Sequence, residues 1–67
     1  MKKRELLRRL KSLAEEKELV LELLRQGANH EIWRVGDLQF PVARHNDVPE
    51  QTARGTIRAV ESYLEAQ

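Results

Sequence analysis

The fold is decided by residues 31–42, EIWRVGDLQFPV. Apolar side chains recur at every second position, at Trp33 and Val35 in residues 31–35 and at Leu38, Phe40 and Val42 in residues 38–42, as they do in strands that are buried on one face. Only Gly36-Asp37 separates the two runs. A two-residue loop between such runs predicts a tight antiparallel hairpin, because glycine at its first position supplies the positive φ of a type II′ turn.

The hairpin brings both histidines of the chain to one end of a small sheet. His30 comes at the start of the first strand, and Arg44-His45 follow the end of the second. Because the strands are antiparallel, these three side chains can share one end of the hairpin and form a candidate site. Strand alternation places Trp33 on the face opposite His30. If His30 faces solvent, we expect Trp33 to pack into the core rather than to offer an exposed ring for stacking.

The N-terminal segment predicts an amphipathic helix. Its apolar side chains have the spacing of one helix face: Leu6, Leu7, Leu10, Leu13 and Ala14. The basic side chains are expected on the opposite, solvated face: Lys3, Arg4, Arg8 and Lys11. We predict that the helix ends near Glu16 and that a buried strand begins near Val20, because a hairpin alone is marginally stable in water. Periodicity also allows one helix over residues 3–24, which would self-associate through its leucines.

A second helix is predicted after the hairpin. Asp47 and Glu50 have the spacing of a capping box, and Pro49 is tolerated in a first helical turn. One apolar face follows: Ala53, Ile57, Val60 and Leu64. Gly55 lowers helix stability, so we expect it where the helix crosses closely over the sheet. The prediction is a single α+β domain over residues 1–67, ordered α-β-β-β-α, with two helices on one face of a three-stranded antiparallel sheet.

Composition narrows the class of protein. The chain has 67 residues and no cysteine, which excludes a disulfide framework and a cysteine-based zinc site and fits a reducing cytoplasm. No apolar run approaches the roughly 20 residues that span a bilayer, so we expect a protein without membrane contact. Residues 1–17 carry seven basic and three acidic side chains, whereas residues 18–67 carry five basic and eight acidic ones. This asymmetry predicts either a local basic surface for an anionic partner or a solvated helix face.

Four motifs, in order, give the chain a resemblance to HicA-type toxins, the small ribonucleases of bacterial or phage toxin–antitoxin pairs. They are KRELL at residues 3–7, LRQGANHEIW at 24–33, VARH at 42–45 and TARG at 52–55. Ala28 and Ala43 replace a glycine and a proline that are common in that family. The resemblance implies a fold like that of the double-stranded-RNA-binding domain, cleavage of mRNA without a metal or other cofactor, and His30 as the catalytic residue. It also implies a cytoplasmic protein, monomeric when free, that forms a hetero-oligomer with a HicB-type antitoxin.

The side chains near His30 suit RNA cleavage on chemical grounds. A neutral imidazole can remove the proton of a 2′-hydroxyl near pH 7, and the hydroxyl oxygen then attacks the adjacent phosphate. Arg25 and Arg44 are candidates for binding that phosphate, and His45 is a candidate for protonating the leaving oxygen. Two further candidates for substrate binding are Asn29 and, on the same strand face as His30, Arg34.

Other interpretations remain open from the sequence alone. His30 can be an ordinary surface histidine, and Arg44 can pair with Glu31 across the hairpin. A zinc site of His30, His45 and Asp47 is conceivable, although its spacing matches no ligand motif. The chain can also be a non-catalytic RNA-binding module that uses the N-terminal helix and the hairpin arginines.

Overall fold

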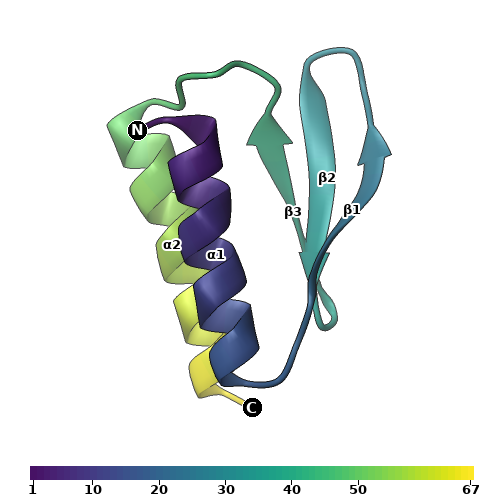
Figure 1. Cartoon of the computed structure of the whole chain (residues 1–67), viewed down its shortest axis with the longest axis vertical. Helices are drawn as coiled ribbons and strands as arrows, with labels where there is room; N and C mark the ends of the chain where they lie inside the picture. Colours follow the sequence, from purple (N-terminus) through teal and green to yellow (C-terminus); the bar gives the residue numbers. More distant parts are fainter.

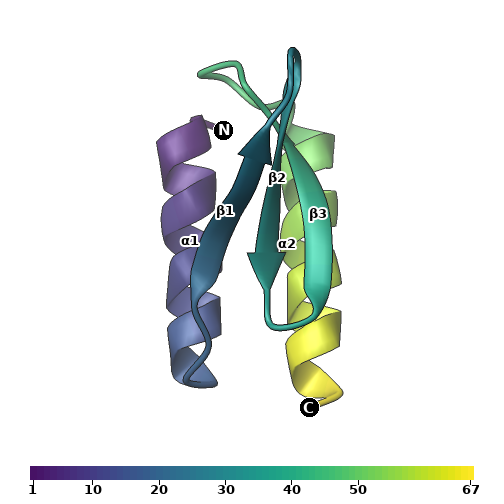
Figure 2. The same cartoon turned by 90° about the vertical axis from the view of Figure 1, so that its right-hand side faces the viewer.

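The computed structural model describes residues 1–67 and confirms the predicted order of elements. These are α1 (Lys3–Glu16), β1 (Leu21–Gln26), β2 (His30–Val35), β3 (Leu38–Ala43) and α2 (Glu50–Glu65). The strands form one antiparallel sheet in the order β1-β2-β3. Figure 1 and Figure 2 show both helices on the same face of this sheet, with α1 next to β1 and α2 next to β3. The other face of the sheet is not covered by a helix.

The helices and the covered face of the sheet enclose one small apolar core. Its buried side chains come from both helices, from β2 and β3, and from the segment before α2: Leu6, Leu10, Ala14, Val35, Phe40, Val42, Val48, Ala53, Val60 and Leu64. Trp33 is half-buried and packs against this core, as strand alternation predicts. The same alternation places His30 on the uncovered face, where it is exposed.

A residue with left-handed backbone geometry ends α1. Glu18 has a φ of 59°, and its amide donates a hydrogen bond to the Glu15 carbonyl, while the Leu19 amide donates to the Ala14 carbonyl. These two bonds form a Schellman motif, which satisfies the last carbonyl groups of the helix. The alternative of one helix over residues 3–24 is therefore wrong, and the leucines of α1 pack inside the chain instead.

The turn between β2 and β3 has the predicted form. Gly36 has a φ of 58° and Asp37 has no positive φ, as a type II′ turn requires. The Tyr63 hydroxyl oxygen of α2 accepts a hydrogen bond of 2.8 Å from the Asp37 amide. α2 therefore holds the closed end of the hairpin, and the opposite, open end carries His30.

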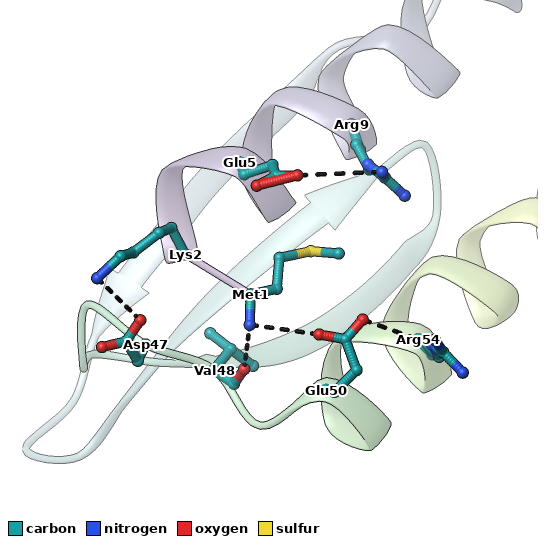
Figure 3. A network of polar contacts seen from close by, with 8 residues as sticks. All are labelled: Met1, Lys2, Glu5, Arg9, Asp47, Val48, Glu50 and Arg54. Atoms are coloured by element: carbon teal, nitrogen blue, oxygen red, sulfur yellow. Dashed lines mark hydrogen bonds and ion pairs between the residues drawn. The ribbon is translucent and has the colours of Figure 1, made fainter.

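The predicted capping box at the start of α2 is wrong. Pro49 occupies the N-cap position and makes no side-chain hydrogen bond. The Asp47 carboxylate instead forms an ion pair of 3.1 Å with the Lys2 ammonium group. Figure 3 shows this pair where residues 1–3 run antiparallel to residues 46–48. The charged partner, Lys2, is distant from Asp47 in the sequence, so a local capping motif cannot predict this ion pair.

Gly55 lies in open space on α2, so the expectation of a close crossing with the sheet is also wrong. A Cβ atom at this position meets no atom within 4 Å. We therefore expect Gly55→Ala to raise the free energy of unfolding by about 0.5–1 kcal/mol, because alanine favours the helix and restricts the unfolded chain. Urea denaturation measures the change.

Gly36→Ala is the contrasting control for this prediction. Gly36 has a positive φ, and a Cβ there lies 2.5 Å from the Tyr63 hydroxyl oxygen, so alanine is expected to destabilise the hairpin. A Gly55→Ala protein that is no more stable than the wild type contradicts the assignment of Gly55 to an unconstrained helical position.

Candidate functional site

His30 lies exposed at the open end of the hairpin and borders a shallow hollow of about 470 Å³. The hollow is lined by residues from the end of β1, the β1–β2 loop and the start of β2: Arg25, Gly27, Ala28, Asn29, His30 and Ile32. Three predicted site residues, Arg25, Asn29 and His30, are therefore brought together. A hydrogen-bonding amide, a titratable imidazole and a permanent positive charge share one solvent-accessible surface.

An irregularity in β1 places Arg25 beside this hollow. The pairing of β1 with β2 shifts between Leu23 and Arg25, so that Leu24 is an extra residue, and Arg25 then pairs with Ile32. In a regular strand, Arg25 would share the covered face with Leu23. The bulge moves Arg25 to the uncovered face, which it shares with His30. The strand pattern alone contains no clear sign of this change.

Arg44 contacts the loop that precedes His30 but does not line the hollow. Its guanidinium Nη1 donates a hydrogen bond of 3.0 Å to the Gly27 carbonyl oxygen. Its backbone amide donates a second bond, of 3.2 Å, to the Asn29 carbonyl oxygen. Arg44 forms no ion pair with Glu31, and the Glu31 carboxylate is bound by Lys3 instead.

His45 and Arg34 lie apart from the hollow. His45 is exposed in the segment between β3 and α2. Arg34 shares the uncovered face with His30 but lies four residues further along β2, which corresponds to about 13 Å of strand. Its guanidinium forms an ion pair with Glu22 of β1. The structure thus separates these two predicted site residues from the group around His30.

An ion pair that involves a buried carboxylate lies directly next to His30 and was not predicted. Glu31 is only 6 % exposed. Its carboxylate is 2.7 Å from the Lys3 ammonium nitrogen and accepts a hydrogen bond of 3.0 Å from Trp33 Nε1. Lys3, which we expected on the solvated face of α1, therefore points toward the sheet. The available signal was an acidic residue on the covered face of a strand, because a buried carboxylate needs a charged or hydrogen-bonding partner.

The surroundings of Glu31 keep its carboxylate ionised. Burial acts to raise its pKa, but the hydrogen bonds from Lys3 and Trp33 and the positive charges of Lys3 and Arg44 outweigh it. The result is a pKa below the usual value of 4.5. At neutral pH, Glu31 is therefore a charged structural anchor rather than a proton donor.

Ion pairs occupy some basic side chains and leave others free. Figure 3 shows two of these pairs, Glu5–Arg9 and Glu50–Arg54, each one helical turn apart. On the exposed surface of α1, a stripe spaced at i, i+4 and i+7 carries no ion pair: Arg4, Arg8 and Lys11. Part of the predicted basic surface is thus available to an anionic partner.

Neither a metal centre nor a known relative identifies the site. No three His, Asp or Glu side chains lie close enough together to hold a metal ion, so the alternative zinc site is not formed. Neither helix has the length and apolar character that crossing a membrane requires. Comparison with protein-family models, curated proteins and solved structures finds no match to the chain.

Proposed function

We propose that this chain is a metal-independent endoribonuclease that cleaves mRNA, as the toxin of a HicA-type toxin–antitoxin pair. The observation that carries the proposal is the exposed His30 ring in a hollow shared with Arg25 and Asn29. A general base has to be accessible to its substrate, and a phosphate that gains negative charge needs a cation within reach. The resemblance of the motifs, in order and spacing, supports the same function.

In the proposed reaction, His30 acts as the general base. Its neutral imidazole takes the proton from a 2′-hydroxyl, the 2′-oxygen bonds to the adjacent phosphorus, and the bond from phosphorus to the 5′-oxygen breaks. The leaving oxygen takes a proton from solvent, because His45 does not line the hollow, and the products are a 2′,3′-cyclic phosphate and a free 5′-hydroxyl. Arg25 stabilises the additional negative charge on the phosphate, and Asn29 orients the nucleotide by hydrogen bonding.

The proposed protein partner is a HicB-type antitoxin that covers the hollow around His30. This hollow is shallow and formed by a single loop and two strand ends, so a bound protein can exclude RNA from it by simple obstruction. The product of the neighbouring reading frame is the first candidate. To test this partner, the two proteins are mixed and then separated. We expect RNA cleavage to be lost in the mixture and to return after separation.

A second candidate function is RNA binding without catalysis. It is favoured by the unpaired stripe of Arg4, Arg8 and Lys11, which can contact several phosphates along one helix face. Such a protein binds RNA with a strong dependence on salt and produces no cut strands. Only the ribonuclease produces cut RNA strands, so one cleavage assay distinguishes the two functions.

That assay incubates the purified chain with RNA in the presence of excess chelator. We expect cut strands that end in a 2′,3′-cyclic phosphate, because the proposed chemistry uses the 2′-oxygen as nucleophile and His30 as base. Gel analysis and end-group mass spectrometry measure the product. Salt-sensitive binding that leaves the RNA intact supports the non-catalytic module instead. If the chain neither cleaves nor binds RNA, both functions are contradicted.

A further inference from the structure

The loop before His30 is closed by hydrogen bonds from within and from outside. Within the loop, the Gly27 amide donates a bond of 2.7 Å to the His30 carbonyl oxygen. From outside, Arg44 donates to the Gly27 carbonyl oxygen through its guanidinium and to the Asn29 carbonyl oxygen through its amide. Arg44 therefore joins the end of β3 to the β1–β2 loop at two points.

The residue after His30 is also held in place. The Glu31 carboxylate is bound by Lys3 of α1 and by the indole of Trp33. The backbone of β2 is thus anchored to the covered side of the sheet immediately beyond His30. On the preceding side, the contacts of Arg44 are the ones that tie the loop to the rest of the chain.

The two arginines near His30 are placed differently. Arg25 lines the hollow and forms no ion pair, so its guanidinium is free to meet a ligand. Arg44 is outside the lining, and its guanidinium already donates to a carbonyl oxygen. Arg25 is therefore the arginine better placed to contact a phosphate bound beside His30, whereas Arg44 already has a structural contact.

We propose that Arg44 is a positioning residue for His30: it fixes the loop of residues 27–29, which directly precedes His30, so that the imidazole stays at the hollow, while Arg25 alone supplies the phosphate contact. The inference rests on the proposed ribonuclease function and assigns different roles to two residues that the sequence presents as equivalent. Proton transfer requires the base within hydrogen-bond distance of the 2′-hydroxyl. A displacement of about 1 Å in such a site lowers the rate by about a hundredfold.

The test compares Arg44→Gln with Arg25→Gln in steady-state cleavage of a single-stranded RNA. For Arg44→Gln, we expect kcat to fall by about ten- to a hundredfold with little change in KM, because the shorter amide cannot reach Gly27 and the base is misplaced. For Arg25→Gln, we expect a higher KM as well as a lower kcat. Arg58→Gln, an exposed change of the same charge on α2, is the control for net charge.

A binding measurement distinguishes positioning from phosphate contact. In the His30→Ala background, which removes cleavage, RNA affinity is measured over a range of salt concentrations. Each phosphate contact to a single strand contributes about 0.7 to the slope of log affinity against log salt. We expect Arg25→Gln to reduce the slope by about this amount and Arg44→Gln to leave it unchanged. Arg44→Lys retains a donor of similar reach, so we expect it to restore part of kcat.

Two results for Arg44→Gln would overturn the positioning role of Arg44. If Arg44→Gln raises KM and reduces the salt slope as Arg25→Gln does, Arg44 contacts phosphate. If Arg44→Gln leaves both kcat and the slope unchanged, it has no role in the site. Thermal melting shows whether either variant has lost its fold, and Arg44→Lys replaces Arg44→Gln in the comparison if it has.

RNA cleavage by the wild-type chain tests the proposed function independently of the role of Arg44. If the wild-type chain cuts no RNA, the ribonuclease proposal fails, and amide hydrogen exchange then tests the positioning role by itself. Arg44→Gln is expected to speed exchange at the Gly27 amide, whose partner is the His30 carbonyl oxygen, whereas Arg25→Gln is not. Equal exchange in the two variants overturns the role of Arg44 in holding the loop.

Discussion

His30→Ala is expected to abolish RNA cleavage while the protein keeps its fold and its stability. The imidazole is exposed, so its removal opens no cavity in the core. The hydrogen bond that closes the loop uses the His30 backbone carbonyl oxygen, which alanine retains. Removal of a general base lowers the rate by about 10²–10⁴-fold, whereas an exposed substitution of this kind changes the free energy of unfolding by about 0.5 kcal/mol or less. Cleavage rates and urea denaturation measure the two effects.

His45→Ala is the matched control, because it removes the only other imidazole of the chain from a position that is also exposed. His45 does not line the hollow, so its replacement is expected to reduce cleavage far less than His30→Ala. Undiminished cleavage by His30→Ala sinks the catalytic role of His30. A complete loss in His45→Ala alone would transfer the role of base to the other histidine.

Lys3→Met is expected to destabilise the fold by about 1–3 kcal/mol, because it removes the ammonium group that binds the buried Glu31 carboxylate and leaves only Trp33 and the more distant charge of Arg44 to stabilise it. Methionine keeps the length and apolar packing of the lysine stem, so the change isolates the charge. A domain of 67 residues has a free energy of unfolding of roughly 3–10 kcal/mol. The variant therefore loses a large part of its stability, which urea denaturation at pH 7 measures.

Arg9→Met provides the control, since it removes an exposed ion pair with Glu5 on the same helix at 4.0 Å. Such a surface pair contributes about 0.5 kcal/mol or less. The double variant Lys3→Met/Glu31→Gln is expected to recover much of the loss, because no charge then remains buried. Equal stability of Lys3→Met and Arg9→Met argues against a buried pair between Lys3 and Glu31.

The same pair predicts how stability changes with pH. The pKa of Glu31 is lower in the folded chain than its usual 4.5, so the unfolded chain binds this proton more readily. The stability contributed by Glu31 is therefore present above the unfolded pKa and is lost as the pH falls through the folded value. In Lys3→Met, burial raises the pKa of Glu31 and only Trp33 and Arg44 remain to lower it, so this acid-induced loss is expected to shrink. Urea denaturation midpoints of the wild type and of Lys3→Met are compared between about pH 3 and pH 7, an interval that includes the unfolded pKa of a glutamate. The midpoint of the variant is expected to fall less at low pH.

Local patterns were sufficient for the main elements of the fold. The alternation around Gly36-Asp37 predicted the hairpin, because one face of each strand packs on the core and glycine provides the turn geometry. The helical spacing of Leu6 and Leu10 predicted the buried face of α1 in the same way. The end of α1 was ambiguous in the sequence because Glu18, and not a glycine, adopts the left-handed conformation that stops the helix.

Contacts between distant parts of the chain were the ones that local patterns missed. Asp47 looked like a helix cap but pairs with Lys2, and Lys3 looked solvated but binds Glu31. Both errors have one cause. These ion pairs join residues that are far apart in the sequence, and such residues come close together only when the chain has folded. Gly55 is a different case: its low helix propensity was taken as a sign of a close contact, although it lies two residues after Ala53 and therefore off the apolar face of α2.

The sequence by itself determined the α-β-β-β-α order, the open end of the hairpin as the place of His30, and the inward direction of Trp33, because periodicity and turn chemistry are local properties. Only the tertiary structure decided which side chains accompany His30. The bulge at Leu24 brings Arg25 to its face, and the meeting of two loops assigns Arg44 to the Gly27 carbonyl oxygen. Strand register and contacts between loops depend on the packing of the whole chain, and a one-residue shift in a strand moves a side chain to the other face of the sheet.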